Sequence, residues 1–373
     1  MLTRLRLLLL SAFIIAWGAE VAQFFMSQGL ALAILAWLQI LPEFAVEASI
    51  AWDQNLPNMT ANFTGSIRLL VGLGWPMIFA TAAFVQWRRK GTLLRVIELE
   101  EEHAVEVVGL LIPILYFLVV WWKASLSVWD GVLLTAIYLL YLFVVNRVPP
   151  KDHEEAEELD YVPRKVMGLR PGLRGATIAA MFVGGGVLLL AVTHPFVDSL
   201  MELALSVGIS EYVFIQWVAP FLSEFPEFLS AFRWAKTVHH APMALMNVAS
   251  SNINQWTVLA GMIPVVYSFS LRRLAVVPFD GMHRHEILLT VLQSLLGMLL
   301  LVNMRFSWWE AAVMFGLWFV QFVVPGIRVQ VMYAYGVAMA LGALEIALGR
   351  RGLHAFGAFA RLMRGSAPAG ARA

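Results

Sequence analysis

The sequence predicts an all-α polytopic membrane protein with about ten or eleven transmembrane helices, built from two inverted five-helix repeats and an extra C-terminal helix. Three observations lead to this fold class. Apolar residues make up 60% of the 373 residues and charged residues only 14%, unlike a soluble domain. Eleven stretches approach the roughly 20 mostly apolar residues that span a bilayer. Two halves on either side of a polar linker show the same order of motifs.

Composition also excludes several classes of function. The 26 basic and 25 acidic residues nearly cancel without a long basic block, so we expect a lipid bilayer and no nucleic acid as partner. The absence of cysteine excludes disulfides, thiolate metal sites and cysteine nucleophiles. No Ser-His-Asp or phosphate-loop signature is present, and we do not expect an enzyme.

The predicted spans follow from runs that lack charge or contain only a few polar residues. In chain order they are 7–25, 26–51, 69–87, 104–122, 131–146, 175–193, 208–232, 243–269, 287–304, 311–327 and 329–344.

The positions of Lys and Arg predict the orientation, because cytoplasmic loops retain them. Most of them fall in the loops after the third, fifth, seventh and ninth spans and in the tail. This places the N-terminus outside and the C-terminus in the cytoplasm of a prokaryotic-type plasma membrane. Arg4 and Arg6 argue the other way, and the stretch after them is alternatively a signal peptide.

The polar segment 149–174 divides the chain and is predicted to be a cytoplasmic linker. It separates a first membrane repeat (1–148) from a second (175–325), which an additional helix (326–349) and a basic cytoplasmic tail (350–373) follow.

Each repeat contains a Pro-Glu motif, a polar stretch and the polar start of the next span, followed by a basic pair and a strand-like stretch. In the first repeat, with its motif region at 39–76, these are LPEFAVEASIAW (41–52), TGSIRLLVGLGWP (64–76) and WRRKGTLLRVIE (87–98). In the second, with its motif region at 222–264, they are SEFPEFLSAFRWA (223–235), MNVASSNINQWTVLAGMIP (246–264) and LRRLAVVPF (271–279). Five spans in the first repeat invert the second copy, as in many secondary transporters.

Carboxylates inside spans are costly and indicate function. Glu43 and Glu227 each follow a proline, which frees a backbone carbonyl one turn earlier. Carboxylate and carbonyl oxygens are the ligands that hard cations prefer, so this pair predicts a cation site. Glu47 and Glu224 add a second carboxylate to each helix face. These two are alternatively proton-bearing or snorkelling side chains.

Neutral oxygens accompany both motifs. Thr64 and Ser66 lie in the first repeat, and Ser251, Asn252 and Gln255 in the second. They supply further candidate ligands, although hydrogen bonding between helices is the alternative explanation.

The paired Pro-Glu motifs and the Ser251-Asn252 pair resemble the alpha repeats of the sodium/calcium exchanger, or cation/calcium antiporter, superfamily. The similarity extends to about residue 325, and the second copy is the better match. It implies antiport of Ca²⁺ against Na⁺ or H⁺ by alternating access at the midplane, with no cofactor besides the transported ions. The cation-binding residues implied are the metal ligands Glu43 and Glu227, together with Gln39, Glu47, Thr64 or Ser66, Ser223, Glu224, Ser251, Asn252 and Gln255.

The first repeat departs from this pattern. Ile67 stands where the family has asparagine, and Arg68 aligns with Gln255, a ligand position in the family. An arginine cannot ligate a cation. If it points inward, we expect it to pair with Glu43 or Glu47 and compensate charge at a cation site. Alternatively it snorkels to the membrane surface.

Two other functions remain open from the sequence. One is an intramembrane metal-dependent hydrolase using Glu43, Glu227 and a histidine, and the other is a scaffold that has lost transport. The groups His239-His240 and His283-x-His285-Glu286 suggest a metal site, but we interpret both as loop residues. The sequence gives no indication of the oligomeric state.

Overall fold

The computed structural model describes residues 2–22, 24, 28–147, 161–206, 208 and 210–364. Residues 149–160 of the predicted linker and residues 365–373 of the predicted tail lie outside the described residues. The description below refers to the described part of the chain, which is almost entirely helical.

The first half contains six helices and two short strands. Its elements are α1 (Leu2–Ala22), α2 (Gln28–Trp52), α3 (Leu56–Leu69), a π-helical turn (Leu70–Gly74), α4 (Trp75–Lys90), β1 (Val96–Glu98), a 3₁₀ turn (Glu101–His103), α5 (Ala104–Lys123), β2 (Ser125–Leu126) and α6 (Val128–Val145).

The second half repeats this order and adds helices at both ends. Its elements are α7 (Tyr161–Met167), α8 (Pro171–Ser206), α9 (Glu211–Ser223), α10 (Phe225–Lys236), a 3₁₀ turn (Val238–His240), α11 (Ala241–Asn254), a π-helical turn (Gln255–Leu259), α12 (Ala260–Ser270), β3 (Val277–Pro278), α13 (Gly281–Leu301), β4 (Arg305–Ser307), α14 (Trp308–Val323), a 3₁₀ turn (Pro325–Ile327), α15 (Arg328–Ala347) and α16 (His354–Met363).

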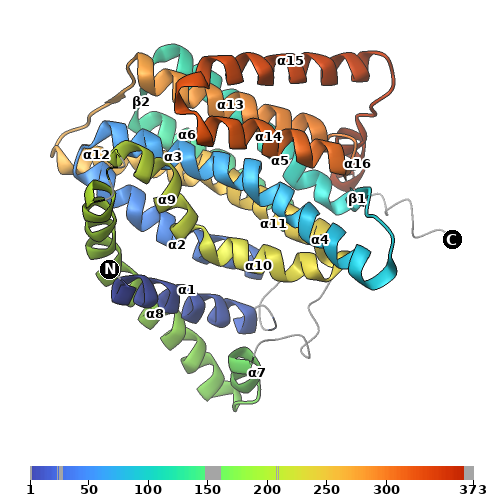
Figure 1. Cartoon of the computed structure of the whole chain (residues 1–373). Coiled ribbons are helices and arrows are strands. Elements are labelled where there is room, and N and C mark those ends of the chain that lie inside the picture. The colour runs from blue at the N-terminus through green and yellow to red at the C-terminus, as the bar shows by residue number, and fades with distance from the viewer. Residues whose placement is uncertain are drawn as a thin grey trace.

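The helices form one bundle with the repeats interleaved. Figure 1 shows α1 and α8 packed together along one side and α15 along the opposite side, where it covers α13. Between them, α3 of the first half packs on α9 and α13 of the second, and α11 of the second packs on α5 and α2 of the first. The central helices therefore contact the other half of the chain.

The predicted all-α polytopic fold is confirmed, because every predicted span falls on a helix or a helical pair. Within the described residues, six helices are long and apolar enough to cross a membrane. They are Leu56–Lys90, Glu101–Lys123, Val128–Val145, Pro171–Leu189, Gly281–Leu301 and Arg328–Ala347.

Two predicted boundaries differ from the structure. The span predicted at 69–87 begins earlier, at Leu56, because the polar residues of α3 are buried within the protein and need no apolar character. Asn55 caps this helix by accepting a hydrogen bond from the backbone N–H of Asn58. The end of the predicted linker is also helical, since α7 lies within it and α8 begins at Pro171.

Two small antiparallel sheets join the halves of the chain. β1 pairs with β4, with Val96 opposite Ser307, and β2 pairs with β3, with Ser125 opposite Pro278. The strand-like stretches predicted after both basic pairs are therefore confirmed. Because each sheet contains one strand from each half, both sheets are related by the same internal symmetry.

The π-helical turns fix the register between α3 and α11. When the two π-helical turns are aligned, Leu70 is equivalent to Gln255. The same offset makes Pro57 equivalent to Pro242, near the start of each helix. Ser66 is then the equivalent of Ser251 in the other repeat.

A second set of matched features fixes the register of the later helices. Ser127 and Asp130 form a capping box at the start of α6, and Ser307 and Glu310 form the same box at the start of α14.

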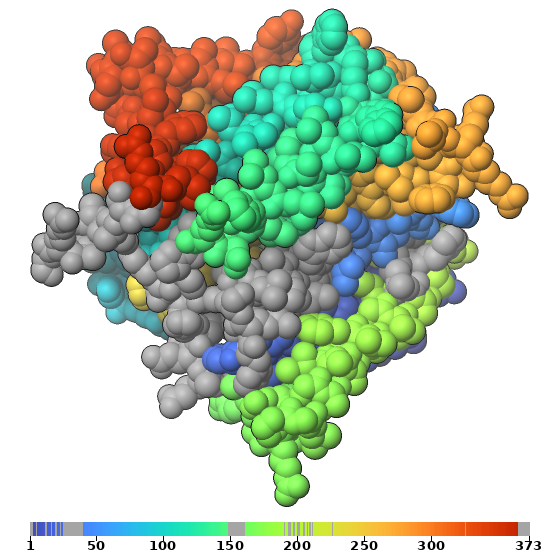
Figure 2. Space-filling view, turned by 180° about the vertical axis from the view of Figure 1, so that it is seen from behind, coloured from blue at the N-terminus to red at the C-terminus, as the bar shows by residue number. Residues whose placement is uncertain are grey.

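The outer surface carries the apolar side chains that a lipid environment requires. Figure 2 shows α5 and α6, coloured teal to green, lying across one outer face. Leu133, Leu139, Leu140 and Phe143 of α6 are exposed. Polar side chains are instead concentrated in the interior of the bundle, which is the reverse of a soluble protein.

A glycine allows the closest helix contact near these interior polar groups. A Cβ atom at Gly65 in α3 would lie 2.0 Å from the backbone oxygen of Gln216 in α9. Such small residues let helix backbones approach closely in membranes.

We predict that Gly65→Ala forces α3 and α9 apart and lowers the free energy of unfolding by about 1–3 kcal/mol. Gly316→Ala in α14 is the matched control, because nothing lies within 4 Å of the Cβ position at Gly316. Thermal unfolding in detergent compares the two variants. Equal midpoints would contradict the close contact.

Candidate functional site

Four glutamates from two helix regions lie in the centre of the bundle. Glu43 and Glu47 come from α2, while Glu224 and Glu227 come from the junction of α9 and α10. None is more than 1% exposed. The chain breaks its helix between Ser223 and Phe225 because the following proline has no N–H to continue the hydrogen-bond ladder.

Gln255 joins the carboxylates of the two halves. Its Nε2 atom donates to Oε2 of Glu43 at 2.7 Å and to Oε1 of Glu224 at 2.6 Å. The carboxyl groups of Glu43 and Glu227 both adjoin that of Glu224. Neighbouring carboxyl groups repel one another when all are charged, so this cluster favours a bound proton or cation.

Hydroxyl groups at equivalent positions flank the carboxyls. Ser251 donates its Oγ hydrogen to Oε1 of Glu227 at 2.5 Å, and Ser66, its counterpart in the first repeat, adjoins Glu43. The structure thus brings together six of the predicted site residues, all of which are buried. They are Glu43, Ser66, Glu224, Glu227, Ser251 and Gln255.

Several oxygens in this cluster have no hydrogen-bond donor. These buried oxygens are Oε1 of Glu43, Oγ of Ser66, Oε2 of Glu227, Oδ1 of Asn252 and Oε1 of Gln255. Buried oxygens without a donor are costly. The cluster is therefore a set of oxygen ligands suited to a hard cation.

Glu47 has a partner that the sequence reasoning missed. Asn62 of α3 donates its Nδ2 hydrogen to Oε2 of Glu47 at 2.6 Å, and both side chains are fully buried. The sequence does contain a signal for this partner, since every second residue of 58–64 is polar. Such a pattern does not suit a helix that faces lipid, so it indicates that the segment is buried within the protein. Glu47 and Asn62 extend the central cluster by one helical turn.

The remaining predicted residues contribute less directly. Asn252 donates Nδ2 to the carbonyl of Val248 at 2.9 Å, which leaves its Oδ1 available. Ser223 donates Oγ to the carbonyl of Pro220 at 3.1 Å. The side chain of Gln39 lies outside the described residues.

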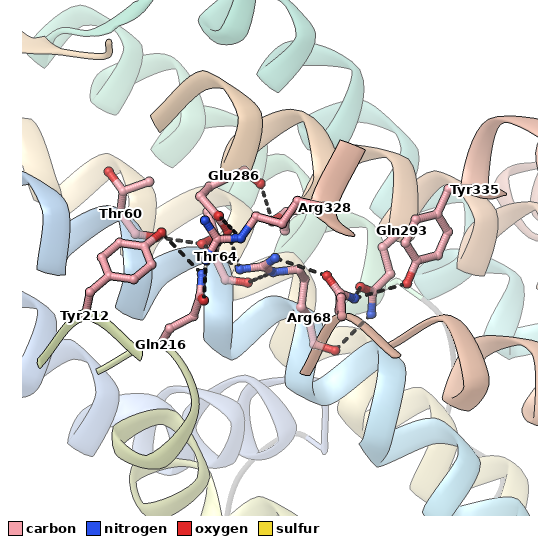
Figure 3. Close-up of polar contacts among 11 residues, drawn as sticks. Thr60, Thr64, Arg68, Tyr212, Gln216, Glu286, Gln293, Arg328 and Tyr335 are labelled. Atoms are coloured by element: carbon pink, nitrogen blue, oxygen red, sulfur yellow. Dashed lines mark hydrogen bonds and ion pairs between the residues drawn. The ribbon is translucent and has the colours of Figure 1, made fainter. Parts of the chain in front are cut away.

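Arg68 points into the protein and is only 1% exposed, so it does not snorkel. Its Nη2 atom lies 2.6 Å from Oε2 of Glu286 in α13, and Nε of Arg328 in α15 lies 2.9 Å from Oε1. Gln216 of α9 donates to the same carboxylate at 2.8 Å. Figure 3 shows the two arginines converging on Glu286 from different helices.

This arrangement corrects the prediction that Arg68 pairs with Glu43 or Glu47. When the π-helical turns are aligned, Leu70 is equivalent to Gln255 and Arg68 is equivalent to Ile253. Arg68 is therefore not the equivalent of the predicted ligand Gln255. Arg68 follows Ser66 by two residues and therefore lies on a different face of α3.

The contacts of Arg68 also distinguish the two predicted hydroxyl ligands of the first repeat, Thr64 and Ser66. It donates to the carbonyl oxygen of Thr64 at 3.1 Å and to its Oγ1 atom at 3.3 Å. Thr64 Oγ1 in turn donates to the carbonyl of Thr60. Ser66, whose Oγ has no partner, is therefore the first-repeat candidate, and Thr64 belongs to the arginine network.

The interpretation of His283 and Glu286 as loop residues is wrong. They lie in the first two turns of α13, which begins at Gly281 because Asp280 caps it by accepting the backbone N–H groups of Met282 and His283. His239 and His240 lie in a short 3₁₀ turn. Among the described residues, no three His, Asp or Glu side chains are placed to hold a metal ion by themselves, so a cation at the central cluster would also need neutral oxygens such as those of Ser66, Asn252 and Gln255.

An inverted-repeat helical bundle with buried carboxylates between its halves defines the class of ion-coupled membrane transporters. The family model described as "Sodium/calcium exchanger protein" matches residues 3–146 and 177–325. The chain belongs to this sodium/calcium exchanger family, and it is an integral membrane protein of the cation/Ca²⁺ antiporter type.

Solved structures give the same family. The chain is similar to the H⁺/Ca²⁺ exchanger CAX, with 30% sequence identity, coverage of 97% of this chain and 91% of that chain, and a TM-score of 0.85. It is also similar to the sodium-calcium exchanger NCX_Mj, with 20% identity, coverage of 87% and 96%, and a TM-score of 0.58. The second likeness shows the fold alone. No curated protein sequence matches significantly.

We predict that Glu286→Gln lowers the free energy of unfolding by about 3–5 kcal/mol, because it leaves Arg68 and Arg328 buried without a counter-charge. Adding Arg68→Gln should recover part of this loss. Chemical unfolding in detergent micelles measures the single and double variants as a cycle. Additive losses would show that the two side chains are not coupled.

Proposed function

We propose that this protein is a Ca²⁺/H⁺ antiporter whose transported ions bind alternately at the central carboxyl cluster. The observation that carries the proposal is the convergence of Glu43, Glu224 and Glu227, which are buried, joined by Gln255 and surrounded by oxygens without donors. Both charge and ligand chemistry support calcium as the transported cation.

The ligand set suits calcium. Ca²⁺ takes about six to eight oxygen ligands and accepts both carboxylate and neutral oxygens. Glu43 and Glu227 supply two negative charges that offset the divalent charge. Ser66, Asn252 and Gln255 supply neutral oxygens from both repeats.

The same carboxyls are suited to exchange protons. Glu224 adjoins the carboxyl groups of both Glu43 and Glu227, and binding of a proton or a cation relieves the repulsion among their charges. Protons and Ca²⁺ therefore compete for the same oxygens. This competition is the simplest physical basis for antiport, since occupancy by one ion displaces the other.

The comparison with known structures favours protons over sodium as the coupling ion. The structure named as an H⁺/Ca²⁺ exchanger matches at 30% identity over nearly the whole chain. The sodium-calcium exchanger matches at 20% identity with a lower TM-score. We further propose that the N-terminus is outside and α16 is at the cytoplasmic face, as the distribution of Lys and Arg predicts.

The symmetry of the bundle supports alternating access. Each half contributes one carboxylate-bearing helical segment and one polar helix to the cluster, and the halves are inverted copies. The copies are not identical, because α2 continues through Pro42 whereas α9 and α10 are separate helices. We expect the junction at Glu224 to be the more readily bent of the two.

We predict that purified protein in proteoliposomes takes up radioactive Ca²⁺ when the interior is more acidic than the exterior. An outward sodium gradient at equal pH should drive no uptake. Glu227→Gln should abolish proton-driven uptake, because it removes one negative charge that balances the bound cation and one proton carrier from the cluster.

Glu98→Gln is the matched control for the substitution. Glu98 is exposed and pairs with the exposed Arg305, so its loss should leave uptake unchanged. Wild-type uptake by Glu227→Gln would contradict the assigned site. Uptake driven only by sodium would contradict the coupling ion, and no flux under any gradient would favour the scaffold hypothesis.

A further inference from the structure

A buried carboxylate outside the central cluster binds side chains from three other helices. Glu286, in the second turn of α13, is fully buried. Its Oε2 atom lies 2.6 Å from Nη2 of Arg68 in α3 and accepts a hydrogen bond from Gln216 of α9 at 2.8 Å. Its Oε1 atom lies 2.9 Å from Nε of Arg328 in α15. Figure 3 shows these side chains meeting at one carboxylate.

Two of these helices carry residues of the central cluster. On α3, Arg68 follows Ser66 by two residues. On α9, Gln216 lies about two turns before Glu224. The backbone N–H of Glu224 donates to the carbonyl of Pro220 at 2.8 Å, which continues the helical hydrogen bonding to that residue. The carboxylate therefore binds the two helical segments that present Ser66 and Glu224.

The backbones of these two segments touch beside Ser66. A Cβ atom at Gly65 would lie 2.0 Å from the carbonyl oxygen of Gln216, so no side chain separates α3 from α9 at this point. The side chain of Gln216, which is bound to Glu286, holds this part of α9 against the glycine.

Glutamine side chains fix Arg68 from two further directions. Gln293 of α13 donates Nε2 to the backbone carbonyl of Arg68 at 2.9 Å, and Gln321 of α14 accepts from its guanidinium at 3.2 Å. Gln321 also donates to Gln293 at 3.2 Å. Both the main chain and the side chain of Arg68 are thus bound, so α3 has a fixed position relative to Glu286.

The ties to Glu286 differ in strength. Arg68 and Arg328 are charged and share Glu286 as a counter-charge, whereas Gln216 is neutral. Losing a buried counter-charge costs far more than losing one hydrogen bond. The α9 segment is therefore the one whose tie to Glu286 can be removed without leaving an unpaired buried charge.

Among the described residues, the first repeat has no such tie. Counting back from the capping boxes that open α6 and α14, Glu106 is equivalent to Glu286. Ile253 is the equivalent of Arg68, and no basic side chain in the described part of the chain binds Glu106. Arg328 belongs to α15, which lies outside the inverted repeats. The arrangement around Glu286 therefore serves one pair of helices, α3 and α9.

We infer that Glu286 is a positioning residue that fixes the spacing between α3 and α9 and so makes the central cluster selective for Ca²⁺ over Mg²⁺. Oxygen ligands lie about 2.3–2.6 Å from Ca²⁺ but about 2.0–2.1 Å from Mg²⁺. Ligands held at a fixed spacing cannot close around the smaller ion. Ser66 and Glu224 are on the two tied segments, so the tie limits how far the cluster contracts. This inference rests on the proposed cation site.

The test measures how well Mg²⁺ competes with radioactive Ca²⁺ for the purified protein at equilibrium in detergent. Gln216→Met removes the tie to α9 with little change in side-chain size, and Glu286→Gln weakens all three ties. Each should lower the ratio of the Mg²⁺ to the Ca²⁺ dissociation constant by at least about fivefold, because the ligands can then approach the smaller ion. Unfolded protein binds neither ion, so this ratio does not depend on the folded fraction.

Glu310→Gln is the matched control for a buried ion pair. Glu310 is 1% exposed and pairs with the buried Arg351 at 2.8 Å, as Glu286 pairs with Arg68. Its other partner is the backbone N–H of Ser307, so these contacts lie outside α3 and α9. The control should lower stability without changing the ratio of the two dissociation constants.

A wild-type ratio in Gln216→Met would overturn the inference, whether or not Glu286→Gln can be purified. An equal fall in Glu310→Gln would also overturn it, because the effect would then come from a general loosening of the bundle. In both cases Ca²⁺ binding by the wild-type protein, and with it the proposed cation site, would stand. Absence of Ca²⁺ binding by the wild-type protein would instead remove the proposed function on which the inference rests.

Discussion

The structure depends on the cost of placing carboxylates inside a membrane. An isolated buried charge is strongly unfavourable, so each carboxylate needs a proton, a cation or hydrogen-bond donors close by. Here Gln255 of the second half donates both to Glu224 of its own half and to Glu43 of the first. This shared donor ties the halves together at their centre, and the remaining oxygens without donors supply the ligands of the proposed transported cation.

The sequence predicted most of the fold because the bilayer imposes long apolar helices and the inverted repeats share visible motifs. Glu43, Glu227 and Gln255 could be found because a charge or an amide in an apolar span has few explanations. The start of α3 could not be found by hydropathy, because its polar side chains are buried against protein and not lipid. The partner of Arg68 was equally hidden, since Glu286 is far away in the sequence and the helix register decides which face Arg68 occupies.

The two repeats differ in the surroundings of two equivalent glutamates, Glu286 and Glu106. At one end of the bundle Arg68 and Arg328 hold Glu286 in a fixed ion pair, and α15, which lies outside the inverted repeats, supplies the second arginine. At the equivalent place Glu106 has neither.

The central claim is that Ca²⁺ and protons compete for the same buried carboxyls. The most direct measurement is the release of protons when Ca²⁺ is added to the purified protein in weakly buffered detergent solution, followed with a pH-sensitive dye. The account predicts proton release that saturates with Ca²⁺ binding and disappears in the Glu43→Gln/Glu227→Gln double variant. Calcium binding without proton release, or release that persists in the double variant, would contradict it.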